Sequence, residues 1–306
     1  KDPKNLWGIL EGETMSTSAI FPKVTREELY GILDRYLEAL KKNDPSQVDW
    51  GSHVRYTENN VNLMVGDGVW NTITDLGDYD LRFADVKTGG VGLFGLLEET
   101  DDTSPFALRL KVEQGKVVEV ETVIVRDKNE PIKFPEKRFE HKPVMNEFLH
   151  PDQRVPRERM IALADGYFNT LELNDGTILT KFHPHCNRME NGTQMTNNPN
   201  PELNPFAKLS CIEQFQLGRY RYDDRVRDRR FPLVDEERGL VLASLFIDHR
   251  GKLGEYRLTD GTVVQSHYRR PHSFYAMELF KIKDGAIEQI EANFITVPYY
   301  MPSAWD

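Results

Sequence analysis

The sequence predicts an α+β protein built from two tandem copies of one domain, and three observations support this. A helical pattern occurs twice, at residues 26–44 and 157–175, and the two copies align without a gap at a constant offset of 131. Each helical pattern is followed by stretches in which apolar and polar residues alternate, as in strands. Each copy then closes with two alternating stretches around a glycine. We therefore expect helices packed on an antiparallel sheet in each copy.

The first expected element of each copy is an amphipathic helix. Six apolar residues of the first copy follow helical i, i+3 and i+4 spacing: Leu29, Ile32, Leu33, Tyr36, Leu37 and Leu40. The alignment matches Tyr36 with Tyr167 and Asp44 with Asp175. Both helices are expected to end at a polar Asn-Asp pair.

A strand carrying a repeated phrase is expected next. "HVRYTENN" at 53–60 and "HCNRMENG" at 185–192 both read His, four residues, then Glu-Asn. Alternation along a strand places Tyr56 and Glu58 on one face, and the matched positions are Arg188 and Glu190. The last elements are hairpins at 110–125 and 280–295, which turn at a glycine.

The repeat also sets the expected boundaries. We predict an N-terminal arm at 1–22, a first domain at 23–128, a Pro-rich and charged linker at 129–153 and a second domain at 154–306. The second copy carries about forty extra residues near 194–235, rich in Asn, Pro and Arg. A long insertion in a compact domain is more often functional than filler.

The hairpins "LRLKVEQGKVVEVETVIV" and "MELFKIKDGAIEQIEANFI", with the "YTENN" and "RMENG" strands, resemble the SnoaL-like branch of the nuclear transport factor two-like superfamily. The resemblance covers nearly the whole chain, twice. It implies two cone-shaped domains, each with helices on a curved sheet around a pocket, paired like the side-by-side dimers of this superfamily. Its members include dehydratases, isomerases, cyclases, lyases and non-catalytic binding proteins, so the fold does not settle the function.

Composition and motifs narrow the expected partners. The net charge is −10 and the basic clusters are interrupted by aspartates, which argues against nucleic acid. No apolar run approaches the roughly 20 residues of a membrane helix, so we expect no membrane partner. A cytoplasmic protein is favoured, although the start at Lys1 leaves open whether an upstream segment was removed. A homo-oligomer is possible.

No motif indicates a cofactor or a metal. "GGVGLFG" at 89–95 has no following helix, so it does not fit a dinucleotide-binding loop. "HPH" at 183–185 lacks a third convergent ligand. The two cysteines, Cys186 and Cys211, are expected to be free thiols. We therefore expect neither a cofactor nor a metal.

Four residues are candidates for catalysis: His185, His267, Arg188 and Tyr56. A histidine can act as general acid or base near neutral pH, an arginine stabilises developing negative charge, and a tyrosine donates a hydrogen bond. A structural need shared by both copies would not exchange the phenol of Tyr56 for the guanidinium of Arg188. The alternative is that the repeated histidines, His53 and His185, only support the neighbouring helices.

Six residues are candidates for substrate binding: Tyr268, Arg269, Tyr275, Glu190, Asn59 and His53. Residues 263–280 add polar and aromatic groups that the first copy lacks, and aromatic walls with a few polar groups suit a flat, hydroxylated substrate. Two alternatives remain open. Residues 263–280 can form a solvated surface hairpin, and Glu190-Asn191 can serve the turn alone.

From the residues and the resemblance we expect a cofactor-independent lyase. It would eliminate water or a small carbonyl such as formaldehyde from an aromatic or polyketide-like small molecule, with the second copy holding the active site. The alternatives are a non-catalytic small-molecule-binding protein, and an isomerase or cyclase using the same pocket.

Overall fold

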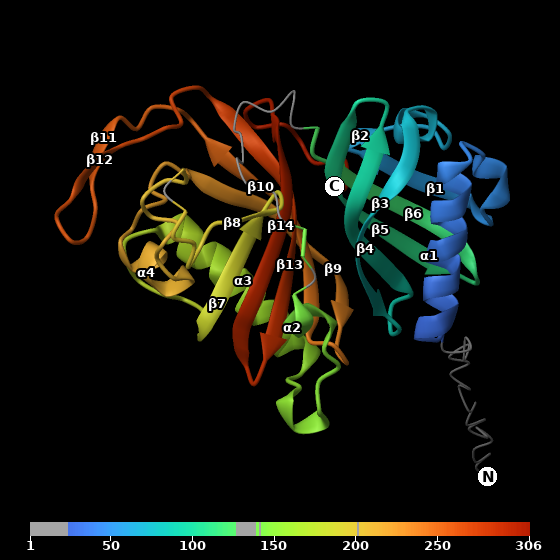
Figure 1. Ribbon diagram of the computed structural model, residues 1–306, viewed down its shortest axis with the longest axis horizontal. Helices are drawn as coiled ribbons and strands as arrows, with labels where there is room; N and C mark the ends of the chain where they lie inside the picture. The colour runs from blue at the N-terminus through green and yellow to red at the C-terminus, as the bar shows by residue number, and fades with distance from the viewer. Residues whose placement is uncertain (1–23, 127–138, 141, 201) are drawn as a thin grey trace, which may run out of the picture.

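The computed structural model describes residues 24–126, 139–140, 142–200 and 202–306 (Figure 1). The predicted N-terminal arm, 1–22, lies outside the described residues, as do residues 129–138 and 141 of the predicted linker. The described chain is an α+β fold with two six-stranded sheets.

Each half of the chain contains one long helix and one of these sheets. The first half consists of α1 (Arg26–Lys41), η1 (Pro45–Gln47), β1 (Trp50–Glu58), β2 (Val61–Asn62), η2 (Gly68–Asn71), β3 (Ile73–Asp85), β4 (Gly90–Glu99), β5 (Asp102–Glu113) and β6 (Lys116–Ile124). The short helices α2 (Pro143–Asn146) and η4 (Pro151–Gln153) lie between the halves in sequence. Within the described residues, we find no helix with the length and apolar character needed to cross a membrane.

The second half repeats this order with additions. It consists of α3 (Arg157–Leu173), β7 (Phe182–Glu190), β8 (Thr193–Gln194), α4 (Cys211–Gln216), β9 (Arg225–Asp235), β10 (Leu240–His249), β11 (Glu255–Arg257), β12 (Val263–Gln265), β13 (His272–Lys283) and β14 (Ala286–Val297). The sheet orders are β2-β1-β6-β5-β4-β3 and β8-β7-β14-β13-β10-β9. In both sheets one pair is parallel, β1 with β6 and β7 with β14, and the other pairs are antiparallel. The two halves therefore share one topology.

The repeated Asn-Asp pair ends both helices in the same way. Asn43 and Asn174 have positive φ angles of 53° and 42°, the left-handed conformation that asparagine tolerates better than most residues. The Asn174 side chain also accepts a hydrogen bond from the backbone N–H of Tyr220 at 2.7 Å. The end of α3 therefore holds a segment that follows α4.

The repeated Glu-Asn phrase has a structural use as well. Asn59 and Asn191 lie in the turns after β1 and β7, with φ angles of 51° and 47°. The Asn59 amide accepts from the N–H of Ile124 at 2.8 Å and donates to its carbonyl at 3.3 Å. Asn191 makes the same two contacts with Phe294, at 2.9 and 3.1 Å. Both asparagines thus tie a turn to the neighbouring parallel strand.

The two sheets lie back to back, and each carries its long helix on the outer face (Figure 1). One apolar core joins α1 to the first sheet, and a second joins α3 to the second sheet. A third core lies between the sheets and includes Phe83 and Phe94 from the first half with Phe246 and Leu279 from the second. Each sheet is therefore buried on both faces.

A buried charge network crosses the contact between the sheets. Glu121 on β6 pairs with Arg109 on β5, Nε to Oε2 at 3.0 Å, and with Arg230 on β9. The hydroxyls of Tyr275 and Ser244 donate to Glu121 Oε1 at 2.6 and 2.7 Å. Burial opposes ionisation of Glu121, but the two arginines and these donors lower its pKa to about 2.

We expect Glu121→Gln to destabilise the protein by about 3–5 kcal/mol, because the neutral side chain leaves two largely buried arginines without their shared countercharge. Urea unfolding would measure the change. Glu119→Gln is the control, since Glu119 also pairs with Arg109 but its side chain is 36% exposed. The control should cost less than about 1 kcal/mol. Equal losses in both variants would contradict a central role for Glu121.

Candidate functional site

A cavity of about 870 Å³ lies in the second half of the chain. Its floor is the face of the second sheet that also carries α3, and alternate residues of the strands line it, as the two-residue period of a strand requires. They are Arg188 and Glu190 on β7, Ile247 and His249 on β10, His272, Phe274, Ala276 and Glu278 on β13, and Ala292, Phe294 and Thr296 on β14.

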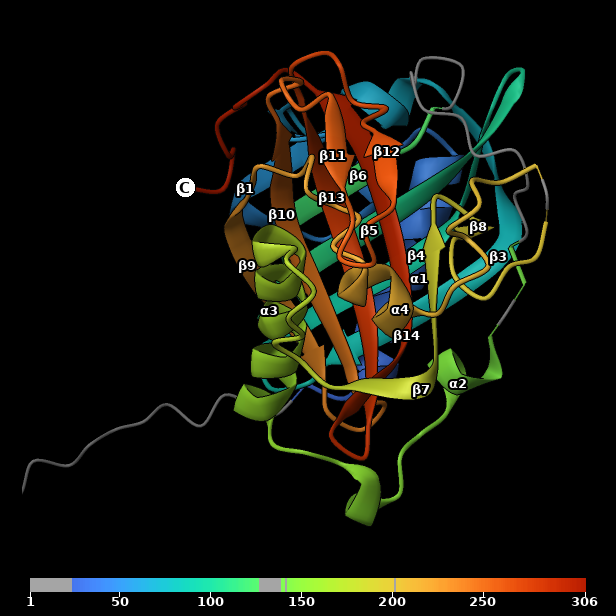
Figure 2. The same ribbon diagram turned by 90° about the vertical axis from the view of Figure 1, so that its left-hand side faces the viewer.

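Two connections that are much longer than their counterparts in the first half cover this floor. Residues 195–224 join β8 to β9 and contain α4, and residues 250–271 join β10 to β13 and contain the hairpin β11–β12. Figure 2 shows α4 and this hairpin in front of the second sheet. The sequence predicts an insertion at 194–235, but β9 pairs in the sheet as β3 does, so the extra chain lies within 195–224, whose counterpart in the first half is 63–72. The second added segment is not predicted.

The first half fills the corresponding space with side chains. Its connection between β2 and β3 is short and carries η2 with the buried Trp70. The rings of Tyr36 and Trp70 meet edge to face with centroids 5.4 Å apart, and Trp50 packs 6.3 Å from Trp70. Tyr36 is the match of Tyr167, which lines the cavity of the second half. The halves thus share a topology but differ in how this space is used.

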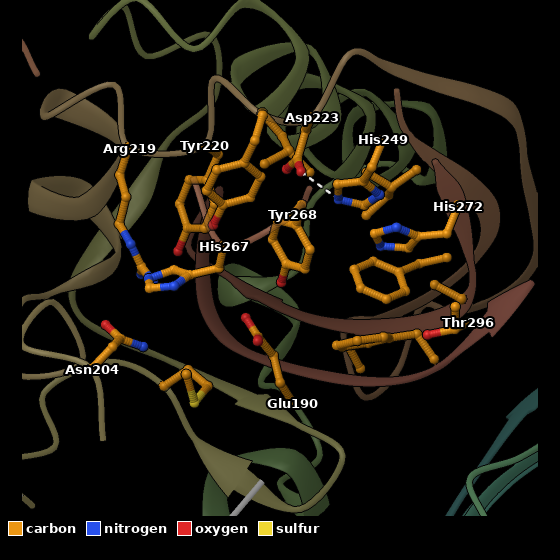
Figure 3. Close-up of a pocket in the computed structure, with 18 of the residues that line it drawn as sticks. Glu190, Asn204, Arg219, Tyr220, Asp223, His249, His267, Tyr268, His272 and Thr296 are labelled. Carbon is orange, nitrogen blue, oxygen red and sulfur yellow. Dashed lines mark ion pairs between the residues drawn. The ribbon is translucent and has the colours of Figure 1, made fainter. Parts of the chain in front are cut away.

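Two histidines stack at one end of the cavity (Figure 3). The rings of His249 and His272 are nearly parallel, with an interplanar angle of 5° and centroids 4.4 Å apart. His249 Nε2 lies 2.8 Å from Asp223 Oδ1, and both side chains are almost fully buried. Desolvation by burial raises the pKa of Asp223, although His249 opposes the shift.

The contacts of the two histidines indicate which ring nitrogens can accept a proton. His272 Nδ1 lies 2.8 Å from the carbonyl oxygen of Arg270, which can only accept, so Nδ1 carries the hydrogen and Nε2 carries the lone pair. His272 Nε2 and His249 Nδ1 are buried and have no hydrogen-bond partner among the described residues. Desolvation by burial also lowers the pKa of His272, and the neighbouring His249 adds to this shift. His272 is therefore a neutral imidazole with a free acceptor near neutral pH.

Tyrosines and a buried acid supply proton donors. Burial raises the pKa of Tyr268, Tyr220 and Tyr222, which keeps the three phenols protonated. Figure 3 shows the Tyr268 hydroxyl pointing into the cavity toward Glu190. Burial raises the pKa of Glu278 to about 8, against the opposing effect of Arg188. Glu278 is therefore largely protonated at neutral pH.

Arg188 connects the floor of the cavity to its cover. Its Nε donates to Glu190 Oε1 at 2.6 Å, and its Nη2 donates to Gln214 Oε1 at 2.8 Å and to the Tyr220 hydroxyl. Gln214 in turn donates to the backbone oxygens of Met195 and Phe206 at 2.7 and 2.9 Å. The charge of Arg188 is thus already balanced by Glu190, and its contacts hold residues 195–224 over the sheet.

Five of the residues predicted for the site lie together at this cavity: Arg188, Glu190, His267, Tyr268 and Arg269. Arg188 and Glu190 face it from β7, whereas the other three reach it from the segment after β12. His267 and Arg269 are exposed at their positions, and Tyr268 is half-buried. Residues 263–280 divide into β12, an irregular segment and β13, so they do not form the single surface hairpin considered above.

The other five predicted residues lie elsewhere. His53, Tyr56 and Asn59 belong to the first half, where Tyr56 is buried in the core and its hydroxyl donates to the carbonyl of Asp67 at 3.2 Å. His185 is exposed on β7 and does not line the cavity. Tyr275 points to the opposite face of the sheet, because it alternates with His272, Phe274 and Ala276, and it donates to Glu121 instead. These five residues therefore cannot contact a ligand bound in this cavity directly.

No sequence pattern points to His249 and Asp223 as site residues. They are 26 positions apart, one at the end of β10 and the other at the end of the added segment, and only the fold brings them together. His272 lies within residues 263–280, where no feature of the sequence distinguishes it from His267. The alternation of His272, Phe274, Ala276 and Glu278 is visible in the sequence and marks one face of a strand, although it does not tell which face is the cavity.

The cysteines lie below the cover of the cavity. Cys186 on β7 and Cys211 on α4 are buried free thiols, with their sulfur atoms 3.1 Å apart. No group of three or more His, Cys, Asp or Glu side chains suited to a metal ion occurs in the part of the chain that the structure describes.

The stability of the protein should fall as the pH rises from about 4.5 to about 8, in part because of Glu278. The folded chain binds this proton more tightly than the unfolded chain, so the stabilising contribution is full at low pH and is lost as the pH passes through about 8. Urea unfolding at a series of pH values would measure the slope.

Glu278→Gln should flatten this slope, by an amount on the order of a few kcal/mol over the full range. Glu291, whose pKa is raised to about 7 by burial, should leave a residual slope in both proteins. Glu202→Gln, which alters an exposed carboxyl of the same cavity, should keep the native slope. If Glu278→Gln and the native protein share one slope, Glu278 is ionised in the fold.

The chain was compared with protein families, curated proteins and solved structures. A model of the family described as "Domain of unknown function (DUF8021)" matches residues 22–124 and 153–294. No curated protein matches the chain. Similar solved structures include a de novo designed protein with a curved β-sheet, at 15% identity and a TM-score of 0.29, covering 35% of this chain and 92% of that chain. Another is "AclR a putative hydroxylase from Streptomyces galilaeus", at 16% identity and a TM-score of 0.30, covering 36% and 87%. At these TM-scores neither likeness supports an inference about this chain.

Proposed function

The chain belongs to the DUF8021 family, and we propose that its second half is a cofactor-independent enzyme that eliminates water or a small carbonyl from an aromatic or polyketide-like small molecule. The observation that carries this proposal is the pair of stacked histidines, one of them 2.8 Å from a carboxylate oxygen of Asp223, beside protonated tyrosines in one cavity. Such a site contains both a base and acids. An elimination requires both.

We also propose that each half is a SnoaL-like cone. Supporting features are the shared strand order, the single parallel pair in each sheet and the long helix on one face. In the second half the cavity lies between this face and the added segments. The position of the cavity fits the pocket that a cone of this kind would enclose.

His272 is the proposed base. Its Nε2 carries a lone pair, lacks a partner among the described residues, and belongs to an imidazole that burial keeps neutral. His249 and Asp223 support it, because the stacked rings fix the orientation of His272 and the carboxyl fixes that of His249. A base so positioned contributes typically 10²- to 10⁴-fold to a rate.

Tyr268 is the proposed acid. Its hydroxyl has no hydrogen bond to a described residue and its phenol is protonated, so it can donate to a leaving hydroxyl or to a developing oxyanion. In an elimination of water, His272 removes a proton from carbon, the electrons of that bond form the new double bond, and the carbon–oxygen bond breaks. The leaving hydroxyl takes the proton of Tyr268 and departs as water, and proton transfer from His272 then restores both residues.

Purified protein, incubated without added cofactor with hydroxylated aromatic and polyketide-like compounds, should convert at least one compound to a product lighter by water or formaldehyde. His272→Gln should lower the rate by about 10²-fold or more, and Tyr268→Phe by about 10²-fold, because each variant keeps a side chain of similar size and removes the group that transfers the proton. Liquid chromatography with mass spectrometry detects both changes.

His185→Gln is the matched control and should keep native activity, since His185 is exposed on β7 outside the cavity. Retention of a compound at unchanged mass and unchanged chromatographic position would contradict the enzyme and favour a binding protein. A new chromatographic position at unchanged mass would instead indicate an isomerase or cyclase. Activity that survives in His272→Gln would show that another group is the base.

A further inference from the structure

Arg219 differs from the other buried arginine of the cavity because its guanidinium has no acceptor. It is 8% exposed, lines the cavity, and packs against the rings of Phe206 and Tyr220 at 4.8 and 5.2 Å. Within the described residues no carboxylate, carbonyl or hydroxyl accepts a hydrogen bond from its side chain. Arg188, in contrast, is paired with Glu190 and Gln214 through Nε and Nη2, and only its Nη1 lacks a partner among the described residues. A buried cation without an acceptor costs free energy unless a ligand supplies one.

The backbone around Arg219 is held from several sides. Gly218 has a φ of 61°, and a Cβ there would lie 2.9 Å from the carbonyl oxygen of Asn174, so glycine is required. The hydroxyl of Tyr256 donates to the carbonyl of Arg219 at 2.6 Å, and the N–H of Tyr220 donates to Asn174. The end of α3 and the hairpin β11–β12 thus fix the backbone from which this side chain extends.

Arg219 lies at the end of the cavity away from the stacked histidines. Figure 3 shows its side chain extending toward His267, with Tyr220 and Tyr268 between it and the pair His249 and His272. The Asn204 side chain lies near the same end. Its oxygen accepts from the N–H of Phe206 at 3.0 Å, and its amide nitrogen, turned toward the interior in Figure 3, has no acceptor among the described residues.

The charge of the lining favours one negative group on the ligand. Four arginines line the cavity (Arg188, Arg219, Arg269 and Arg270), as do four carboxyl residues (Glu190, Glu202, Asp223 and Glu278). Glu278 is largely protonated at neutral pH, so the balance is positive. Arg219 is the buried one among the lining arginines that lack a carboxylate partner in the described residues, and its guanidinium matches a planar carboxylate, which it can bind through two parallel hydrogen bonds.

We propose that the cavity binds an aromatic carboxylic acid whose carboxylate pairs with Arg219, with the aromatic body lying along Tyr220 and Tyr268 toward His272. This inference rests on the proposed function for the class of ligand, but it concerns binding and can be tested without turnover. Arg219 then sets which end of the substrate reaches His272, and Asn204 donates a further hydrogen bond to the carboxylate.

The test is isothermal titration calorimetry with 4-hydroxycinnamate and its primary amide, which share size and aromatic body but differ in charge. The native protein should bind the acid at least about 10-fold more tightly than the amide, because a charge-assisted hydrogen bond is roughly twice as strong as a neutral one and is buried here. Arg219→Gln should abolish this preference. Arg219→Lys should keep part of it, since the charge remains without the planar fork.

Arg221→Gln is the matched control, because Arg221 lies two residues away, is exposed and does not line the cavity. It should retain the native preference. Circular dichroism would check the fold of each variant, and if Arg219→Gln does not fold, the native protein and Arg219→Lys decide the question. Equal binding of acid and amide to the native protein overturns the proposal, as does a preference that survives in Arg219→Gln or no binding of either compound at millimolar concentration.

The two proposals can fail separately. Preference for the acid, lost in Arg219→Gln, together with no conversion of any compound would support the carboxylate site and contradict the enzyme. Conversion that depends on His272, without any preference for the acid, would support the enzyme and contradict the carboxylate site.

Discussion

Burial of both faces of each sheet is the constraint on which the rest of the structure depends. A six-stranded sheet that is apolar on both sides cannot leave either face in water, and a single helix of 16 or 17 residues covers only part of one. The back-to-back contact covers one face of each sheet at once, with Glu121 as its polar centre. The part of each outer face that the helix does not cover still has to be shielded from water. The two halves of the chain shield it in different ways.

In the first half, aromatic rings pack against this uncovered part of the outer face. In the second half, added segments of chain cover it, and a cavity remains between them and the sheet. Trp70, on a short connection, reaches Tyr36 directly. In the second half, Arg188 replaces the phenol of Tyr56 at the matched position and bonds to Gln214 and Tyr220 of the added chain. The guanidinium of Arg188 has several donors and can hold a loop at a distance from the sheet. The ring of Tyr56, packed in a core, cannot do this.

Much of the fold could be predicted from the sequence, but only part of the site could. The repeat, the helices and the closing hairpins follow from local periodicity, which one sequence contains. At the position matched to Tyr56, Arg188 lines the cavity of the second half, whereas Tyr56 lies in the core of the first. The pairing of Asp223 with His249 depends on the path of an irregular segment, for which no periodicity exists. Tyr275 faces away from the cavity because its side of the sheet packs against the other half. The alternating pattern of the sequence defines two faces of the strand but does not tell which of them meets the other half.

Aromatic rings occupy in the first half the space that corresponds to the cavity of the second half, so the two copies are not equivalent as ligand sites. A dimer of two identical subunits has two equivalent sites, and both must satisfy the same demands of stability and chemistry. Covalent duplication removes that symmetry. One copy can become a permanently packed partner whose sheet supports the other, while changes in the second copy are free to alter ligand choice without weakening a twin site. Within the described residues, the rings of Tyr36, Trp50 and Trp70 pack the first copy, and the cavity of about 870 Å³ lies in the second, so stability and ligand choice can be served by different copies of one chain.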